Sequence, residues 1–184
     1  MKTDLSKYDN SWYQPGSKLK RLLWYFVNWF FFESGWNISS GLKVFLLRRF
    51  GAKIGKGVLI KPKVTIKYPW KLQIGDHCWI GESVWIDNLD QVTLENNVCI
   101  SQGALLICGN HNYKISTFDL FIAPIVLKEG SWVGAKSIVS PGVSLESHSV
   151  LSLGSVATKD LEAYSIYSGN PAQKVKTRKI ESTK

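Results

Sequence analysis

An aliphatic residue returns at every sixth position through the second half of this 184-residue sequence. The positions with this spacing are Leu127, Val133, Val139, Leu145, Leu151 and Ala157. An amphipathic helix would repeat near 3.6 residues and a half-buried strand at every second residue, so neither accounts for the period. Hexapeptide repeats are typical of a parallel β-helix, in which each short strand and its turn make one hexad. The pattern therefore predicts an all-β solenoid with the aliphatic side chains along its axis.

The same pattern extends toward the N-terminus with short interruptions. Its earlier members are Ile54, Ile60, Ile66, Ile74, Ile80, Ile86, Val92, Leu94, Ile100 and Leu106. Two extra residues enter around Tyr68 and Pro69, and two more at Val92 and Thr93. A longer break covers residues 108–126. We therefore expect the coil to occupy residues 54–161, with one excursion loop at 108–126 in which chemistry is to be sought.

Two other positions of the hexad are restricted in size. The fifth residue is small or slender, which suits a tight corner, at Ser131, Ser137, Val143, Ser149 and Ser155. Glycine directly follows the aliphatic residue at Gly55, Gly75, Gly81 and Gly134. Because glycine adopts positive φ without strain, we expect these glycines to supply left-handed backbone to the turns.

The charge of the chain is concentrated at its two ends. Lysine and arginine exceed acidic residues by 23 to 14, a net charge of +9. Residues 1–53 carry nine basic and three acidic side chains, residues 174–184 carry five and one, and the remainder is nearly neutral. A nucleic-acid-binding domain would present a basic stripe along its main body. The distribution instead indicates two basic ends with separate roles and no nucleic-acid partner.

The N-terminal region 1–53 is predicted to be a helical appendage. We expect no regular structure in residues 1–16, then a helix over 18–33 capped by Ser17. A second helix should begin after Ser39 or Ser40 and end before Gly51, with Leu42, Phe45, Leu46 and Phe50 on one face.

The first predicted helix has two unusual features. It carries Lys18, Lys20 and Arg21 in its first turn, the wrong end for the helix dipole, so these cations suit phosphate or lipid headgroups. Residues 22–32 are apolar nearly all the way round but number only eleven, whereas a membrane span needs about 20. Two compatible interpretations stay open for residues 18–50. They cover the end of the coil or pack against another subunit, or they contact a membrane surface peripherally.

The three cysteines, Cys78, Cys99 and Cys108, form no CxxC pair, which favours a reducing compartment. The apolar run at 22–32 is not expected to be a secretory signal, because it begins late and is followed by Glu33 rather than by a small-residue cleavage site. We therefore expect a cytoplasmic protein, which can also attach peripherally to the inner face of the cytoplasmic membrane.

Residues 54–175 resemble the hexapeptide-repeat acyltransferases, which fold as a left-handed parallel β-helix. The C-terminal half is similar to the maltose and galactoside O-acetyltransferases in Val133-Gly134-Ala135, Ser140-Pro141-Gly142-Val143, Ala157-Thr158-Lys159-Asp160 and Gly169-Asn170-Pro171-Ala172. Residues 46–60 and 66–74, with the apolar helix, are similar to the colanic acid biosynthesis acetyltransferases. The resemblance implies a homotrimer, because the donor groove of the family lies between two subunits. In the tail at 162–184 we expect a turn and then a short basic helix starting at Asn170-Pro171.

A general base is required to remove the proton of an attacking hydroxyl, and a histidine titrating near neutral pH suits that task. His111 lies where the repeat leaves the coil, and in the resembled family the histidine at this place is the catalytic base. Asp119, in the same excursion, would orient the imidazole. His77 and His148 occupy the fourth position of their hexads and are expected at solvated turns.

The resemblance further implies acetyl-CoA as co-substrate and no metal. Pantetheine amides would meet the main chain near Ala135 and Leu153, and the phosphates would meet Thr158 and Lys159. Lys174 and the basic tail either bind the 3′-phosphate of coenzyme A or contribute to solubility. For the acceptor sugar, the galactoside branch uses an Asn where this chain has Gly81, which leaves Trp85, Asp87, Asn88 and Gln102 as candidates. The resemblance of the front to the colanic acid acetyltransferases, with its aromatic basic helix, implies a sugar on a polyprenyl-phosphate carrier, or its growing repeat unit, as acceptor. A free small-molecule sugar stays open as well.

These features predict an O-acetyltransferase of exopolysaccharide or capsule biosynthesis that transfers acetyl directly, without an acyl-enzyme. A γ-type carbonic anhydrase would need three histidines around zinc, and its second excursion histidine is replaced by Ser116. A non-catalytic membrane scaffold and an acyltransferase with a different, longer-chain donor stay open as alternatives.

Overall fold

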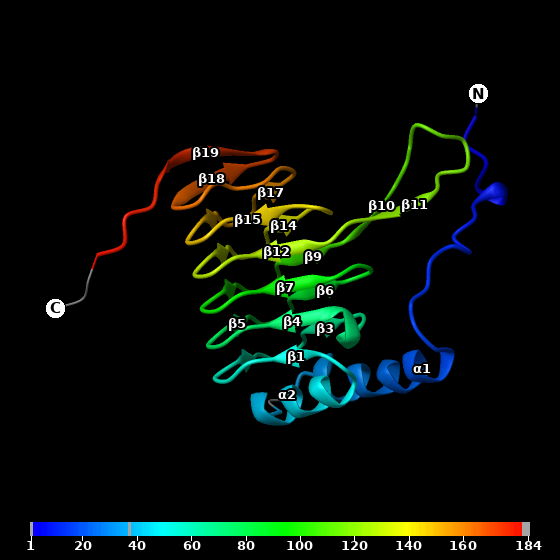
Figure 1. The fold of residues 1–184 in the computed structure, drawn as a ribbon, viewed down its shortest axis with the longest axis horizontal. Coiled ribbons are helices and arrows are strands. Elements are labelled where there is room, and N and C mark those ends of the chain that lie inside the picture. The colour runs from blue at the N-terminus through cyan, green and yellow to red at the C-terminus, as the bar shows by residue number, and fades with distance from the viewer. Residues whose placement is uncertain (1, 37, 182–184) are drawn as a thin grey trace.

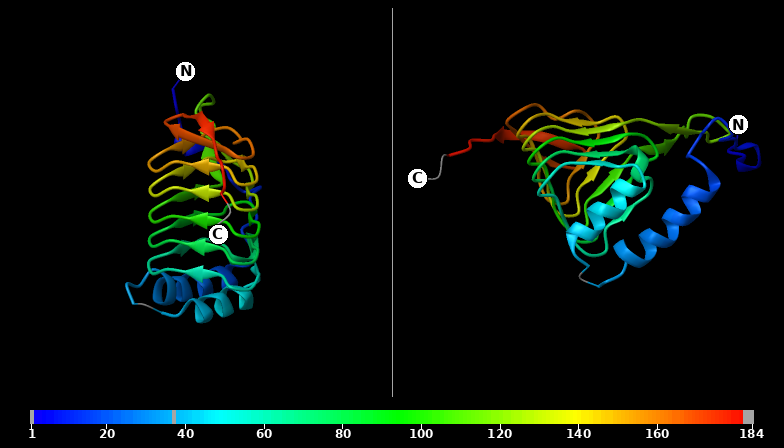
Figure 2. Two further views of the ribbon diagram at one scale, coloured as in Figure 1. Left: turned by 90° about the vertical axis from the view of Figure 1, so that its left-hand side faces the viewer. Right: turned by 60° about the horizontal axis from the view of Figure 1, so that its bottom comes forward.

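The computed structural model describes residues 2–36 and 38–181, and a three-sided prism of short parallel strands forms its centre (Figures 1 and 2). The first face contains β1 (Lys53–Ile54), β4 (Leu72–Ile74), β7 (Val92–Leu94), β12 (Ile125–Leu127) and β15 (Ser144–Leu145). The second contains β2 (Leu59–Ile60), β5 (Trp79–Ile80), β8 (Cys99–Ile100), β13 (Trp132–Val133) and β16 (Val150–Leu151). The third contains β3 (Thr65–Ile66), β6 (Trp85–Asp87), β9 (Leu105–Ile107), β14 (Ile138–Val139) and β17 (Val156–Ala157). Successive strands occupy successive faces, so the predicted solenoid is confirmed.

The aliphatic residues of the hexads form the core of the prism. On the second face, strand register stacks Ile60, Ile80, Ile100, Val133 and Leu151 directly above one another. Each of these side chains is at most 2% exposed. The short helix η3 (Pro69–Lys71) takes up the extra residues near Tyr68 that interrupt the six-residue count. The register places every aliphatic position of the repeat on the axis, as the period predicts.

The left-handed backbone of the turns does not fall on the predicted glycines. It falls three residues after each aliphatic position, for example at His77 (φ +57), Asn97 (φ +60) and His148 (φ +58). Gly81 and Gly134 have a different role, because the next coil passes too close for a side chain. A Cβ on Gly134 would lie 2.5 Å from the Leu153 nitrogen, and one on Gly81 would lie 2.6 Å from the Gln102 nitrogen. The prediction of positive φ after the aliphatic residue was therefore wrong.

Two helices cover the N-terminal end of the prism (Figures 1 and 2). Helix α1 (Lys18–Val27) starts at the Ser17 cap, whose hydroxyl accepts from Lys20 N, and continues into a π-helical turn, η2 (Asn28–Phe32). Helix α2 (Ser40–Arg49) is capped in the same way by Ser39. The predicted helices and both serine caps are confirmed, and Trp24, Phe32 and Leu47 join the hydrophobic core of the coil.

Side chains of these helices satisfy the exposed main-chain edge of the first coil. Trp24 Nε1 donates to Ile66 O over 2.7 Å, and Lys43 Nζ donates to Lys61 O over 2.8 Å. Ser40 Oγ accepts from Ile60 N over 2.9 Å. An unpaired strand edge is otherwise a template for association with another chain. The helices therefore cap the solenoid, which is one of the two interpretations given for residues 18–50.

The face of α2 that packs on the coil matches the predicted one only in part, because Leu46 and Phe50 pack against the core. Lys43 and Leu47 are fully buried, whereas Leu42 and Phe45 are exposed. The helix is turned so that the Lys43 ammonium reaches the Lys61 carbonyl oxygen. Helix α1 and the turn η2 also expose a broad apolar surface, formed by Leu19, Leu22, Leu23, Tyr25, Phe26, Trp29 and Phe30. Within residues 2–36 and 38–181, no helix combines the length and apolar character needed to cross a bilayer.

The C-terminal end is closed by strands rather than by the predicted helix. Strand β18 (Ser165–Gly169) pairs with β16, and β19 (Ala172–Thr177) pairs antiparallel with β18. The turn between them contains Asn170 and Pro171, so proline here ends a strand instead of beginning a helix. The free edge of β18 supplies main-chain partners, and the β-branched Val175 and Thr177 suit a strand. The predicted C-terminal helix was wrong because this pairing is not local.

The excursion at residues 108–126 forms a hairpin that projects from the prism (Figure 1). Its strands are β10 (Gly109–His111) and β11 (Leu120–Ile122). The N-terminal segment, with the short helix η1 (Leu5–Lys7), lies beside it, and Asp4 N donates to Ser116 O over 2.8 Å. The expectation of no regular structure holds for residues 2–16 apart from η1, but the segment has a fixed place because it contacts the hairpin.

Candidate active site

His111 ends strand β10, directly opposite Leu120 on β11. Its imidazole is stacked on the Phe118 ring, with centroids 4.6 Å apart and planes within 6°. The Tyr8 ring of the N-terminal segment lies 5.7 Å away at a tilt of 55°. The half-buried imidazole is thus held by aromatic contacts from both the hairpin and the N-terminal segment.

A main-chain carbonyl fixes the proton on this imidazole. His111 Nδ1 lies 2.9 Å from Phe118 O. A carbonyl oxygen can only accept a hydrogen bond, so Nδ1 carries the hydrogen and Nε2 of the neutral ring keeps its lone pair. Phe118 itself has φ +54, a conformation that a bulky residue rarely adopts. The loop thereby presents a carbonyl to Nδ1 and leaves Nε2 available as a base.

Asp119 does not take the orienting position that the sequence suggests. Its main-chain oxygen accepts from Asn112 N over 2.8 Å. Across residues 2–36 and 38–181, its carboxylate forms no hydrogen bond with His111. The neighbouring Phe118 carbonyl does what was expected of Asp119, and the sequence carries no signal for a main-chain group.

His111 lines an open cleft of about 710 Å³ between the N-terminal segment and the solenoid. Tyr8, Tyr13, Tyr68 and Leu89 contribute aromatic and apolar walls. The basic residues Lys18, Arg21 and Lys67 line the same cleft. Its volume lies within the range of small-molecule sites. Sequence reasoning missed the tyrosines, because the N-terminal segment that supplies two of them contains no recognisable motif.

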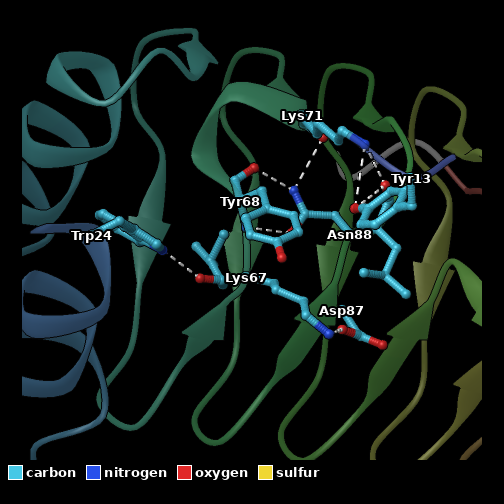
Figure 3. A network of polar contacts seen from close by, with 9 residues as sticks. Tyr13, Trp24, Lys67, Tyr68, Lys71, Asp87 and Asn88 are labelled. Carbon is cyan, nitrogen blue, oxygen red and sulfur yellow. Dashed lines mark hydrogen bonds and ion pairs between the residues drawn. The ribbon is translucent and has the colours of Figure 1, made fainter. Parts of the chain in front are cut away.

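Asn88 is a structural residue in this chain rather than a sugar ligand. Its side chain is fully buried, and Figure 3 shows it bonded to the main chain of the preceding coil. Oδ1 accepts from Tyr68 N, while Nδ2 donates to Tyr68 O and to Lys71 O. Because the side chain is fully buried and Nδ2 donates both of its hydrogens to the main chain, Asn88 is not accessible to an acceptor sugar, and its assignment as a substrate residue is corrected.

Asp87, the next residue toward the N-terminus, forms an ion pair with Lys67, with 2.7 Å between Nζ and Oδ1 (Figure 3). Because Lys67 lines the His111 cleft, this pair lies at its edge. Asp87 therefore stays a candidate for contact with the acceptor, through or beside the Lys67 ammonium.

Tyr13 fastens the N-terminal segment to the solenoid. Its hydroxyl donates to Leu89 O over 2.8 Å, and Lys71 Nζ donates to the same carbonyl over 2.5 Å (Figure 3). Burial raises the pKa of Tyr13 and lowers that of Lys71. Both shifts indicate a poorly solvated contact, which keeps this wall of the cleft in place.

Trp85 and Gln102 face other clefts within a single chain. Trp85 lines a cleft of about 490 Å³ beside α1, together with Leu22 and Tyr25. Gln102 and Gly81 line a groove of about 790 Å³ over the second face of the prism. The structure therefore does not bring these residues to His111 within one protomer.

The expected donor-binding residues lie toward the C-terminal end of the prism. Ala135 and Leu153 occupy equivalent corners of successive coils, where Gly154 N donates to Ala135 O over 2.8 Å. Thr158 and Lys159 are exposed just after β17. Lys174 forms an ion pair with Glu162 at 2.6 Å, and that hydrogen bond raises the pKa of Lys174. Of the two lysines expected to bind phosphate, Lys159 is therefore more available than Lys174.

The cysteines are poorly suited to nucleophilic attack. Cys108 is fully buried at the base of the hairpin, and burial raises its pKa to about 12. Burial also raises the pKa of Cys78 and of Cys99. Because the thiolate is the reactive form, these side chains stay unreactive near neutral pH.

Comparison with known proteins relates the whole chain to acetyltransferases. No protein-family model matches the sequence. It is 36% identical over 166 residues to the proposed colanic acid biosynthesis acetyltransferase WcaF of Escherichia coli, covering 90% of this chain and 91% of that protein. It is 25% identical over 134 residues to the galactoside O-acetyltransferase of the same organism, covering 71% and 66%.

Solved structures share the fold. A hexapeptide-repeat acetyltransferase from Vibrio cholerae aligns with a TM-score of 0.80 at 19% identity, covering 89% of this chain and 93% of that one. Galactoside acetyltransferase in complex with coenzyme A aligns with a TM-score of 0.76 at 23% identity, covering 89% of each chain. The likeness to both structures extends over nearly nine-tenths of this chain.

Proposed function

Because this chain belongs to the hexapeptide-repeat acetyltransferases, by its 36% identity to WcaF over 90% of its length, we propose that it acetylates a sugar hydroxyl during synthesis of an exopolysaccharide or capsule. Acetyl-CoA is the acetyl donor of this enzyme. The observation that carries the proposed chemistry is the hydrogen bond from His111 Nδ1 to Phe118 O, which leaves Nε2 as a base in an open cleft.

In the proposed reaction His111 Nε2 takes the proton of the sugar hydroxyl as its oxygen attacks the thioester carbonyl. The C–O bond forms, the tetrahedral intermediate collapses, and the C–S bond breaks. The imidazolium returns its proton to the departing thiolate, so the ring ends in its starting form. A main-chain N–H near Ala135 would stabilise the oxyanion, a contribution of about 3–4 kcal/mol for a well-placed donor. The high pKa of Cys108 supports direct transfer without an acyl-enzyme.

The donor would lie along the corner that contains Ala135 and Leu153, with its phosphates toward Thr158 and Lys159. We expect Lys174 to contribute less to phosphate binding than Lys159, because Glu162 already pairs with its ammonium.

We also propose that the coil is left-handed and that the enzyme is a homotrimer. In a trimer, Trp85 or Gln102 of a neighbouring subunit could complete the acceptor site that one protomer leaves open. The Asp119 carboxylate could stabilise the His111 imidazolium only after the hairpin loop rearranges.

The N-terminal helices would hold the enzyme on the inner face of the cytoplasmic membrane. The exposed apolar face of α1 and η2 includes Leu23, Phe26, Trp29 and Phe30. Residues 1–53 carry nine basic side chains against three acidic ones. Apolar side chains together with cations are the features that bind a helix to an anionic lipid surface. This location would bring the enzyme to a lipid-linked glycan.

Calorimetric titration tests the donor site first. Coenzyme A and acetyl-CoA should each bind wild type with a stoichiometry near one per chain, and His111→Ala should retain this binding while losing acetyl transfer. If neither ligand binds saturably, the assignment as an enzyme is refuted, and a non-catalytic membrane scaffold of the same fold is favoured. Competition with long-chain acyl-CoA would show whether acetyl is the preferred group.

A further inference from the structure

We propose that the His111 cleft contains a binding site for a phosphate group of the acceptor, formed by Lys18, Arg21 and Lys67. The proposal rests on the proposed function, because it assumes that the hydroxyl to be acetylated lies at His111. It adds the residues that would bind the phosphate or diphosphate ester of such an acceptor.

The first argument is the charge of the cleft. Three cations line it together with His111, and no carboxylate lines it within the part of the chain that the structure describes. Lys67 is paired with Asp87 at 2.7 Å. In the same described ranges, Lys18 and Arg21 form no ion pair. The cleft therefore offers at least two cations whose charge is not neutralised.

The second argument is the state of Arg21. Its Nε atom is buried and has no hydrogen-bond partner among residues 2–36 and 38–181. A buried N–H of a charged group without an acceptor is unfavourable. Lys18 and Arg21 also lie in the first turn of α1, where the helix dipole disfavours cations. An anion in the cleft would relieve both effects, and a guanidinium binds phosphate oxygens particularly well.

The third argument is the order of chemical groups along the molecule. The cleft beside α1 that contains Leu22, Tyr25 and Trp85 shares Arg21, Lys67 and Tyr68 with the His111 cleft. The cations thus lie between the candidate base and a second, largely apolar cleft beside the helix, which Asn28 and Glu33 also line. A sugar joined through phosphate to a hydrocarbon chain has its groups in the same order.

The phosphate could belong to a lipid carrier or to a soluble sugar phosphate, and two probes distinguish these sources. Inorganic pyrophosphate and farnesyl diphosphate would be titrated calorimetrically into wild type, the double variant Lys18→Gln/Arg21→Gln, and the control Arg49→Gln. Arg49 is an exposed cation of α2 that lines neither cleft.

We expect both probes to bind the double variant at least about tenfold more weakly than wild type, with Arg49→Gln unchanged. Thermal unfolding monitored by circular dichroism would establish that each variant is folded. Tighter binding of farnesyl diphosphate than of pyrophosphate supports a lipid-linked acceptor, and equal binding supports a soluble one. Binding that is absent in wild type at millimolar concentration, or unchanged in the double variant, would overturn the site.

Two further results separate this inference from the proposed function. If Lys159→Gln abolishes pyrophosphate binding while Lys18→Gln/Arg21→Gln does not, the anion occupies the donor site and the inference is wrong. If pyrophosphate binds through Arg21 but coenzyme A does not bind at all, the phosphate site stands and the acetyltransferase assignment fails.

Discussion

At His111, the 2.9 Å contact between Nδ1 and the Phe118 carbonyl leaves Nε2 as the one ring nitrogen able to accept a proton. The stacked Phe118 ring and the nearby Tyr8 ring restrict rotation of the imidazole. A base that is already oriented and in the correct tautomer loses little freedom when the acceptor binds. The residue is therefore equipped for proton abstraction by its neighbours rather than by a carboxylate.

Replacing His111 with alanine should lower kcat by roughly 10²–10⁴, the usual contribution of a general base. Coenzyme A affinity and the unfolding temperature should change little, because the imidazole contacts only the hairpin and the N-terminal segment. The matched control is His77→Asn, since Asn97 occupies the equivalent left-handed position of the next coil. Turnover of His111→Ala within twofold of wild type would reject the assignment of the base.

Cys108 should resist alkylation. Its pKa is raised from 9 to about 12, so the thiolate is scarce at any pH well below 12 and becomes abundant only above it. Iodoacetamide treatment of the native protein at pH 8, followed by mass spectrometry, should leave this cysteine unmodified. Acetyl transfer should survive the treatment. Rapid labelling of Cys108 with parallel loss of activity would instead support a covalent acyl-enzyme.

The residue level also shows the limits of sequence reasoning. The sequence singles out His111, because it lies where a strict repeat is broken and matches the histidine of the resembled family, and its role as the base stays a prediction. Its hydrogen-bond partner was not predictable, because any residue at position 118 carries the same carbonyl, and its direction depends on the backbone of the loop. Asn88 was wrongly assigned to the acceptor site, because its type does not reveal its partner. A buried amide that bonds to the preceding coil and an amide that binds sugar look the same in a sequence.

At the level of structural elements, the close contact between successive coils determines which residues each turn tolerates. A Cβ on Gly134 would meet the backbone of the next coil, whereas a Cβ on Gly154 would have open space. At Gly154 the restriction on a side chain comes from the left-handed φ of +66. The equivalent left-handed position is occupied by Lys136, His148 and Asn97 in other coils. Steric contact, rather than backbone conformation, is thus the stronger restriction.

These two glycines form a matched test. Gly134→Ala places a methyl group 2.5 Å from a backbone nitrogen and should destabilise the protein by about 3 kcal/mol or more. Gly154→Ala requires only a left-handed alanine, which costs about 1–2 kcal/mol. Thermal unfolding should therefore show a clearly larger loss for Gly134→Ala. Equal losses would mean that the coils separate easily to accommodate the methyl group.

The elements that the sequence predicted correctly are those determined locally. The repeat, both helices and the serine caps depend on residues within a few positions of one another. The C-terminal helix was predicted wrongly and the buried face of α2 only half correctly, because each depends on a distant partner. Strand β19 exists because β18 offers a free edge, and α2 is oriented by the Lys61 carbonyl of the first coil.

At the scale of the whole molecule, the two ends of the solenoid differ in chemistry. The C-terminal end is closed by a strand pair and carries the expected donor residues. The N-terminal end is closed by helices that expose a broad apolar surface beside several cations. The His111 cleft lies between the hairpin and the start of α1. This arrangement allows donor and acceptor to approach the base from opposite ends of the prism.

Whether the exposed face of α1 contacts lipid or another subunit is decided by one pair of measurements. The variant Phe26→Asp/Trp29→Ser should lose flotation with phosphatidylglycerol vesicles, because burial of two aromatic side chains contributes about 3–6 kcal/mol. Its mass by light scattering should equal that of wild type. Val175→Ser is the control, since Val175 is 56% exposed, as Phe26 is, but lies on β19 at the C-terminal end of the prism. If the double variant instead dissociates into smaller species, the face is a subunit contact, and a lipid-linked acceptor loses this support.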